Sequence, residues 1–113
     1  MMTHSMKLAK EPFEKIANGK KIIESRLFDE KRRLIDVGDE IEFLRNDDST
    51  QVVKTKVRAL YRYGSFENLF ADFPPEYFGG DSKEFLLEEI GRFYPMEEQE
   101  KYGVVGIRIE PRR

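Results

Sequence analysis

Residues 52–63 read VVKTKVRALYRY, and this stretch decides the class of fold. Apolar or aromatic side chains stand at nearly every second position, a period that predicts a long β-strand with one covered face. The covered face would carry Val53, Thr55, Val57, Ala59, Tyr61 and Tyr63, and the other face Lys54, Lys56, Arg58 and Arg62, interrupted only by Leu60. A strand of this length is stable only beside partner strands, so the sequence predicts a sheet.

Turn and capping signals divide the rest of the chain into short elements around that strand. Residues 46–49 predict a hairpin to a strand over 40–44, and further strands are predicted over 6–9, 21–28 and 104–109. Helices are predicted from Glu11–Pro12 to Asn18–Gly19, after Ser65, and after Asp81 or Ser82 with an apolar stripe of Phe85, Leu86, Ile90 and Phe93. The expected fold is α+β: a small β-barrel of mixed and antiparallel strands, with helices covering the barrel ends.

The composition narrows the classes of protein to consider. The chain has 113 residues, 39% of them apolar and 37% charged, and no cysteine. This length predicts a single domain over residues 1–113, and the lack of cysteine, signal peptide and membrane span predicts a cytoplasmic protein. The single histidine, His4, lies in a terminus that we expect to be mobile, so no metal site is predicted. No glycine-rich phosphate loop is present, and no cofactor is expected.

Charge is distributed unevenly along the chain. The net charge is −2, but residues 1–64 carry +3 and residues 65–113 carry −5. A protein that tracks long nucleic acid duplexes would be basic overall, so any nucleic acid contact here is expected to use a local patch. The acidic second half leaves a protein-interaction module open as an alternative function.

Four short segments follow one another in a recognisable order. They are GKKIIESR at residues 19–26, VGDEIEF at 37–43, YRYGSFENL at 61–69, and FYP at 93–95 followed by YGVVGI at 102–107. Together they resemble the ASCH family, whose signature Gly-x-Lys-x-x-Glu-x-Arg is similar to the first segment. The resemblance implies a PUA-like β-barrel, related to an RNA-binding module, with a cleft beside the signature strand proposed to hold RNA or a nucleotide. It also implies a possible enzyme, since some bacterial members are amidohydrolases that deacetylate N4-acetylcytidine.

The signature segment holds the first candidate site residues. Glu24 and Arg26 fall on one face of a regular strand, whereas Lys21 points away and joins them only if the chain bends after Asn18–Gly19. The three would suit a polar ligand, because Arg offers a planar donor fork to a phosphate or a base edge and Glu accepts from an exocyclic amine. The alternative is an ordinary charge pair on a solvated strand, which contributes little.

Five further residues are candidates for binding single-stranded RNA or a nucleoside-like small molecule. Lys20, Arg32 and Arg33 would face phosphates, and Tyr63 would offer a ring surface to a base. Tyr94 would either line the cleft or brace the closing strand. Each has a structural alternative. A short basic run is usually a solvated loop, and strand tyrosines usually belong to the core, with the hydroxyl at its rim.

The nucleophile position separates an enzyme from a binding module. The amidohydrolase members of the ASCH family place a Thr three residues after the signature Lys, and here that position is Glu24. Lys21 and Glu24 are therefore the candidate catalytic residues, with Glu24 activating a water instead of forming a covalent intermediate. The family's further Glu, before the last helix, has no unambiguous match, although Glu76 and Glu84 lie nearby. Binding of RNA or a nucleoside is the first hypothesis, hydrolysis of an acylated nucleoside the second, and neither involves a membrane.

Overall fold

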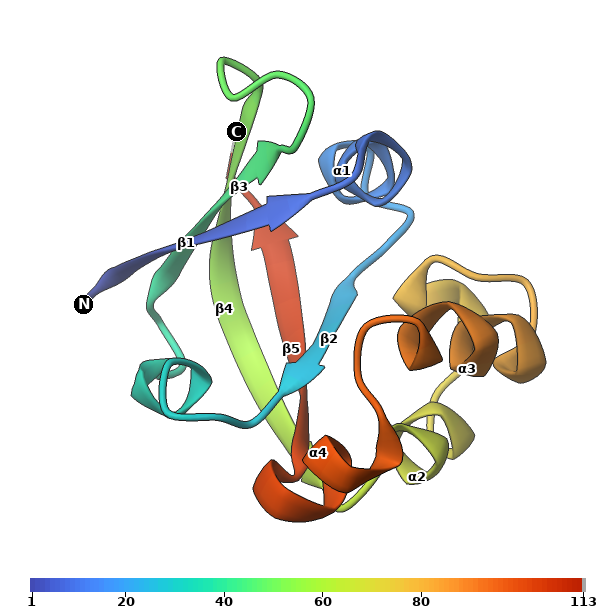
Figure 1. Ribbon diagram of the computed structural model, residues 1–113. Coiled ribbons are helices and arrows are strands. Elements are labelled where there is room, and N and C mark those ends of the chain that lie inside the picture. Colours follow the sequence, from blue (N-terminus) through green and yellow to red (C-terminus); the bar gives the residue numbers. More distant parts are fainter. Residues whose placement is uncertain (113) are drawn as a thin grey trace.

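The computed structural model describes residues 1–112, which form a curved sheet with helices packed against it (Figure 1). The strands are β1 Thr3–Leu8, β2 Ile23–Leu27, β3 Glu40–Arg45, β4 Val52–Tyr63 and β5 Val104–Pro111. The α-helices are α1 Lys10–Ala17, α2 Phe66–Ala71, α3 Lys83–Gly91 and α4 Met96–Tyr102, and the 3-10 turns are η1 Arg32–Leu34 and η2 Pro75–Phe78. Ser65 and Ser82 cap α2 and α3 by accepting hydrogen bonds from backbone amides three residues on.

The strands of residues 1–112 form one sheet in the order β1–β3–β4–β5–β2. β1 pairs with β3 in parallel, and the other neighbours are antiparallel. β1 and β2 are the two edge strands, and the sheet between them is curved into a half-barrel (Figure 1). Arg26 on β2 reaches the opposite edge, where its guanidinium donates to the Lys7 carbonyl of β1 at 3.1 Å. This mixed half-barrel with its helices confirms the predicted α+β class.

The long strand β4 is bulged, and the predicted division of its faces is therefore wrong. The register with β5 shifts at Arg58, which has no partner in the ladder. The extra residue reverses the alternation, so that Val57 and Leu60 face one side and Tyr61 faces the other. Leu60, which interrupts the predicted basic face, is a core contact. Arg62 consequently shares the face of Val57 and Leu60.

Two apolar clusters lie on the two faces of the sheet. The first packs α1 against the sheet and comprises Met6, Leu8, Phe13, Ile16, Ile35, Ile41, Phe43, Val57, Val105, Ile107 and Ile109. The second packs α2, η2 and α3 against β2 and β5 and comprises Ile23, Leu27, Phe66, Leu69, Phe70, Phe78, Leu86 and Val104. β5 is thus covered on both faces, which explains its unbroken buried run. A Cβ at Gly106 would lie 3.0 Å from the Leu69 side chain, so a larger residue here would require Leu69 to shift by a few tenths of an ångström.

The apolar stripe predicted for the helix after Ser82 is only partly buried. Leu86 is buried, but Phe85 and Phe93 are 47% and 70% exposed. The predicted stripe treated all four residues as one helical face, whereas α3 ends at Gly91 and Phe93 lies in the connection to α4. The exposed Phe93 and Met96 therefore lie where α3 meets α4, whereas Phe85 lies in the first turn of α3.

The N-terminus is part of the sheet, so the expectation of a mobile terminus around His4 is wrong. β1 begins at Thr3, and His4 Nε2 lies 2.8 Å from Asp39 Oδ2. The buried Asp39 carboxylate also accepts hydrogen bonds from the backbone amides of Met2 and Asp36, both at 3.0 Å. These contacts hold β1 against the start of β3.

No helix within residues 1–112 combines the length and apolar character needed to cross a membrane. In the same part of the chain, no three His, Asp or Glu side chains converge as ligands of a metal ion would. The sequence contains no cysteine, so packing and hydrogen bonds hold the fold together without disulfides.

Candidate functional site

A bend before β2 places Lys21 beside Glu24. Gly19 adopts a left-handed backbone conformation with φ of 82°, after which the Lys21 amide donates to the Lys15 carbonyl at 2.9 Å. The Ile22 amide donates to the Tyr77 carbonyl, so regular pairing of β2 starts only at the next residue. The bend turns the Lys21 side chain back, and its Nζ lies 2.9 Å from Glu24 Oε1.

Glu24 is the centre of a nearly buried charged cluster. Arg26, two residues along the same face, places its Nε at 3.0 Å and a terminal nitrogen at 2.9 Å from Glu24 Oε2. The Ser25 amide donates to Glu24 Oε1 at 3.1 Å. The side chains of Glu24, Lys21 and Arg26 are 4%, 12% and 14% exposed. The carboxylate is therefore inaccessible, whereas the two cations keep a small accessible surface.

The electrostatics of the cluster favour the charged forms of Glu24 and Arg26. Burial opposes ionisation of Glu24, but the charges and hydrogen bonds of Lys21 and Arg26 outweigh it and lower its pKa to about 2. Burial likewise opposes the charge on Arg26, but Glu24 and the neighbouring Tyr94 hydroxyl outweigh it and raise the pKa of Arg26. The Tyr94 hydroxyl therefore borders the cluster, whereas the Tyr94 ring packs against the second apolar cluster, 5.7 Å from the Phe66 ring.

The saturated carboxylate limits what Glu24 can do chemically. Both oxygens already accept hydrogen bonds, which leaves little acceptor capacity for an amine of a ligand. A carboxylate with a pKa near 2 is also a weak base, poorly matched to activating water at neutral pH. Lys21 and Arg26, in contrast, retain donors that Glu24 does not use. The arrangement suits recognition of an acceptor group or an anion.

The remaining candidates from the sequence lie apart from this cluster. Lys20 is exposed, and the Asn18 side chain accepts from its amide. Arg32 is paired with Asp29 at 2.9 Å, and its buried Nε has no hydrogen-bond partner among residues 1–112. Tyr63 lies on the opposite face of the sheet, where its hydroxyl donates to Asp72.

Arg33 is brought close to two residues that the sequence reading did not select. Its guanidinium carbon lies 4.3 Å from the centroid of the Phe28 ring, and that of Arg62 lies 4.5 Å from the same centroid. The prediction placed Arg62 on the face of Lys54 and Lys56, and the bulge in β4 explains the error. No signal in the sequence alone reveals the bulge except the misplaced Leu60.

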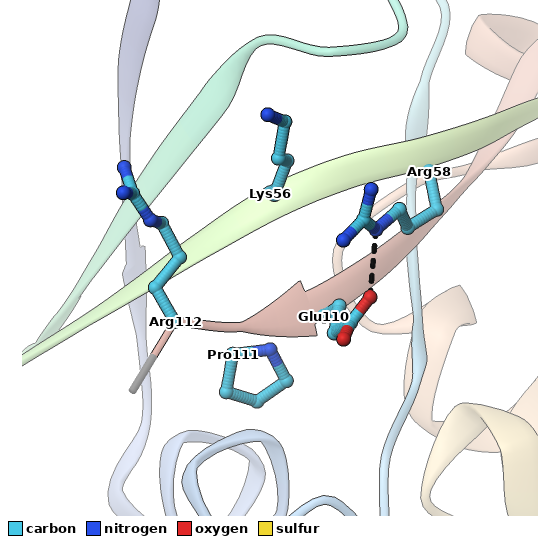
Figure 2. Close-up of a pocket in the computed structure, with 5 residues that line it drawn as sticks. All are labelled: Lys56, Arg58, Glu110, Pro111 and Arg112. Atoms are coloured by element: carbon cyan, nitrogen blue, oxygen red, sulfur yellow. Dashed lines mark hydrogen bonds and ion pairs between the residues drawn. The ribbon is translucent and has the colours of Figure 1, made fainter.

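Two hollows lie elsewhere on the described surface, and one of them shares Tyr94 with the cluster. One, of about 490 Å³, is lined by Lys56, Arg58, Glu110, Pro111 and Arg112, which spread along β4 and β5 in Figure 2. Its charges are largely compensated, because Arg58 pairs with Glu110 and Arg112 pairs with Glu40. The other, of about 320 Å³, is lined mainly by apolar side chains at the junction of α3 and α4 and includes Tyr94.

The curved mixed sheet, with helices on both faces and a charged cluster on its edge strand, is an α+β half-barrel domain. The chain belongs to the ASCH domain family, whose model matches residues 6–113.

Known structures agree with this assignment. The chain is 40% identical to protein PF0455 from Pyrococcus furiosus, with a TM-score of 0.77 and 97% of each chain covered. It is 38% identical to the hypothetical protein PH0355, with a TM-score of 0.85, covering 99% of this chain and 100% of that one. An ASCH protein from Zymomonas mobilis shares the fold at 16% identity and a TM-score of 0.69, over 96% of this chain and 69% of that one. No curated protein matches the chain.

Proposed function

We propose that this ASCH domain binds single-stranded RNA or a nucleoside-like small molecule at the cluster of Lys21, Arg26 and Tyr94. One observation carries the proposal: a buried carboxylate holds two cations in fixed positions, and neither cation uses all of its donors on Glu24 and the Lys7 carbonyl. Glu24 positions the donors and does not itself contact the ligand. Arg26 offers a planar fork to a base edge or a phosphate, and Lys21 offers a point charge.

A titration with cytidine and N4-acetylcytidine tests this proposal. Lys21→Met should abolish binding of both, because it removes the ammonium donor and keeps an unbranched side chain only one atom shorter. Lys56→Met, on the outer part of β4, is the matched control and should bind as the wild type does. Thermal melts of both variants show whether any loss of affinity reflects unfolding. Unchanged affinity in a destabilised Lys21→Met would mean that the cluster only braces the fold.

RNA binding, if it occurs, should be weak and modestly dependent on salt. Only a few cations surround the cluster, and the net charge of the chain is −2, so few phosphates can be neutralised. Single strands expose the base edges and faces that such a site reads. Titrations of single-stranded and duplex RNA at two salt concentrations test the expectation, and tight duplex binding at high salt would contradict it.

Hydrolysis of an acylated nucleoside remains the alternative activity of the same residues. The saturated, strongly acidic Glu24 argues against a water-activating base. We therefore expect no release of acetate from N4-acetylcytidine by the wild-type protein. Turnover by the wild type that disappears in Glu24→Gln would instead favour hydrolysis over binding alone as the function of these residues.

A second candidate function uses the apolar hollow at the junction of α3 and α4. Its lining includes Leu87, Ile90, Pro95 and Met96, and the surrounding residues 84–100 contain six Glu and a single Arg. An apolar groove with an acidic rim complements a basic amphipathic segment of a partner protein. A synthetic helical peptide of Leu and Lys should bind the wild-type protein and should bind the Met96→Glu variant less tightly. Leu34→Glu, at an exposed leucine elsewhere, is the control.

A further inference from the structure

The Phe28 ring contacts two guanidinium groups. It follows β2 directly, and its ring contacts Arg33 from η1 and Arg62 from β4, at 4.3 and 4.5 Å from ring centroid to guanidinium carbon. These distances are those of cation–π contacts, which favour arginine over an aromatic face. Arg33 is further fixed by a hydrogen bond of 3.3 Å from a terminal nitrogen to the Tyr102 carbonyl. Two cations are thus held as neighbours by one ring.

This pair lies beside the proposed ligand site. Arg62 on β4 and Arg26 on β2 both stand opposite Val105 of β5, so the three residues form one row across the sheet. Partners in such a row point to the same face, and two strand spacings separate the backbones of Arg26 and Arg62 by about 10 Å. Phe28 packs against the first apolar cluster, which lies on that same face of the sheet. A single nucleotide can span the distance between the two arginines.

The charges of this pair are uncompensated within the described chain. Over residues 1–112, neither Arg33 nor Arg62 lies within ion-pair distance of a carboxylate, whereas the adjacent Arg32 is paired with Asp29. Both side chains belong to exposed residues. Like charges held together repel each other, and a surface that fixes them without a carboxylate complements an anion.

We propose that Arg33 and Arg62, held over Phe28, form a phosphate subsite. It receives the phosphate of an RNA or nucleotide whose sugar or base lies at Lys21, Arg26 and Tyr94, and in this respect it rests on the proposed function. The two guanidinium groups offer donors to the phosphate oxygens, and their contacts with the ring limit their motion before the ligand arrives.

Comparing cytidine with its 3′- and 5′-monophosphates tests the subsite. The wild type should bind at least one monophosphate about tenfold more tightly than cytidine, the gain expected from one or two charge-assisted hydrogen bonds. The double variant R33Q/R62Q should lose this preference and keep its affinity for cytidine. Arg58→Gln, on the same strand but paired with Glu110, is the matched control and should keep the preference. A preference that survives in R33Q/R62Q would overturn the proposal.

A second measurement does not depend on nucleoside binding. Titration with pyrophosphate should shift the NMR resonance of the Arg62 Nε–H group saturably, and Phe28→Leu should weaken that response, because leucine keeps the apolar contact but removes the ring. If the wild type ignores cytidine yet shows this shift, the proposed function fails and the phosphate subsite stands. No shift with pyrophosphate would overturn the subsite. A shift with a polyglutamate peptide and none with pyrophosphate would also overturn it, in favour of an acidic protein partner.

Discussion

Glu24 and Asp39 are both buried carboxylates whose pKa values are lowered to about 2, yet their surroundings differ. Glu24 owes its low pKa, against the opposing effect of burial, to the cations Lys21 and Arg26. Asp39 owes its low pKa first to the hydrogen bond with His4 and then to two backbone amides. One carboxylate is stabilised by two cationic side chains, and the other by hydrogen bonds from His4 and two backbone amides.

This difference decides which of the two carboxylates can support the binding of a ligand. A backbone amide has one proton, and at Asp39 those protons are spent on the carboxylate. Lysine has three donor protons and arginine five, so Lys21 and Arg26 satisfy Glu24 and still present donors outward. Asp39 therefore completes the junction of β1 and β3, whereas Glu24 supports a surface that remains open to a ligand.

The largest effect that tests this comparison is acid unfolding. Both carboxylates have folded-state pKa values below their ordinary values of 4.5 and 3.8. Their stabilisation is therefore complete above about pH 5 and is lost as the pH falls toward 2, on the order of 5 kcal/mol for the two together. Urea unfolding at intervals from pH 6 to pH 2 measures it. A free energy of unfolding that is flat across this range would contradict the assignment of both groups.

Removal of one cation from Glu24 should be the next largest effect. Arg26→Met leaves the buried carboxylate with Lys21 alone and removes the contact to the Lys7 carbonyl. We expect a loss of about 3 kcal/mol, the lower end of the cost of breaking a buried ion pair. Arg58→Met breaks the pair with Glu110, in which both side chains are more than half exposed, and should cost under about 1 kcal/mol. Equal losses in urea unfolding of the two variants would mean that Glu24 does not depend on its partners.

The sequence predicts the elements of this fold better than their faces. Strands, caps and hairpin follow from local signals such as Ser65, Ser82 and the alternation in residues 52–63. The bulge at Arg58 arises from pairing with β5, a nonlocal event, and it moves Arg62 to the opposite face. Period-two arguments therefore hold on each side of a bulge but not across it.

In the candidate site, too, the contacts set by local sequence are predicted and those set by nonlocal strand pairing are missed. The bend after Gly19 that returns Lys21 to Glu24 is anticipated, because glycine accepts the required φ. The contact between His4 and Asp39 is missed, because the parallel pairing of β1 with β3 brings together residues 35 apart in sequence. Binding by these residues is still a prediction, which ligand titrations must test.

A smaller effect separates the structural carboxylate from the binding one. Asp39→Asn replaces one acceptor oxygen by a donor and sets it against either His4 or a backbone amide. We expect a loss of about 2 kcal/mol, typical of hydrogen bonds to a charged group, with no change in affinity for cytidine. Glu24→Gln should lower stability and affinity together, because Lys21 and Arg26 lose the group that positions them. Loss of cytidine affinity in Asp39→Asn, with its melting curve still cooperative, would contradict a purely structural role for Asp39.

The smallest expected effect is that of His4, and it tests whether His4 stabilises the fold through its hydrogen bond to Asp39. His4→Leu removes one hydrogen bond to a carboxylate that retains the Met2 and Asp36 amides, so we expect a loss of about 1 kcal/mol. Leucine fills most of the space of the imidazole, so little of this loss should come from packing. In an Asp39→Asn background the same substitution should cost much less, because the partner oxygens have already changed. Urea unfolding of the wild type, the two single variants and the double variant gives the coupling energy directly. Strictly additive losses would show that His4 stabilises β1 by packing alone, and Asp39 would then owe its low pKa to the backbone amides.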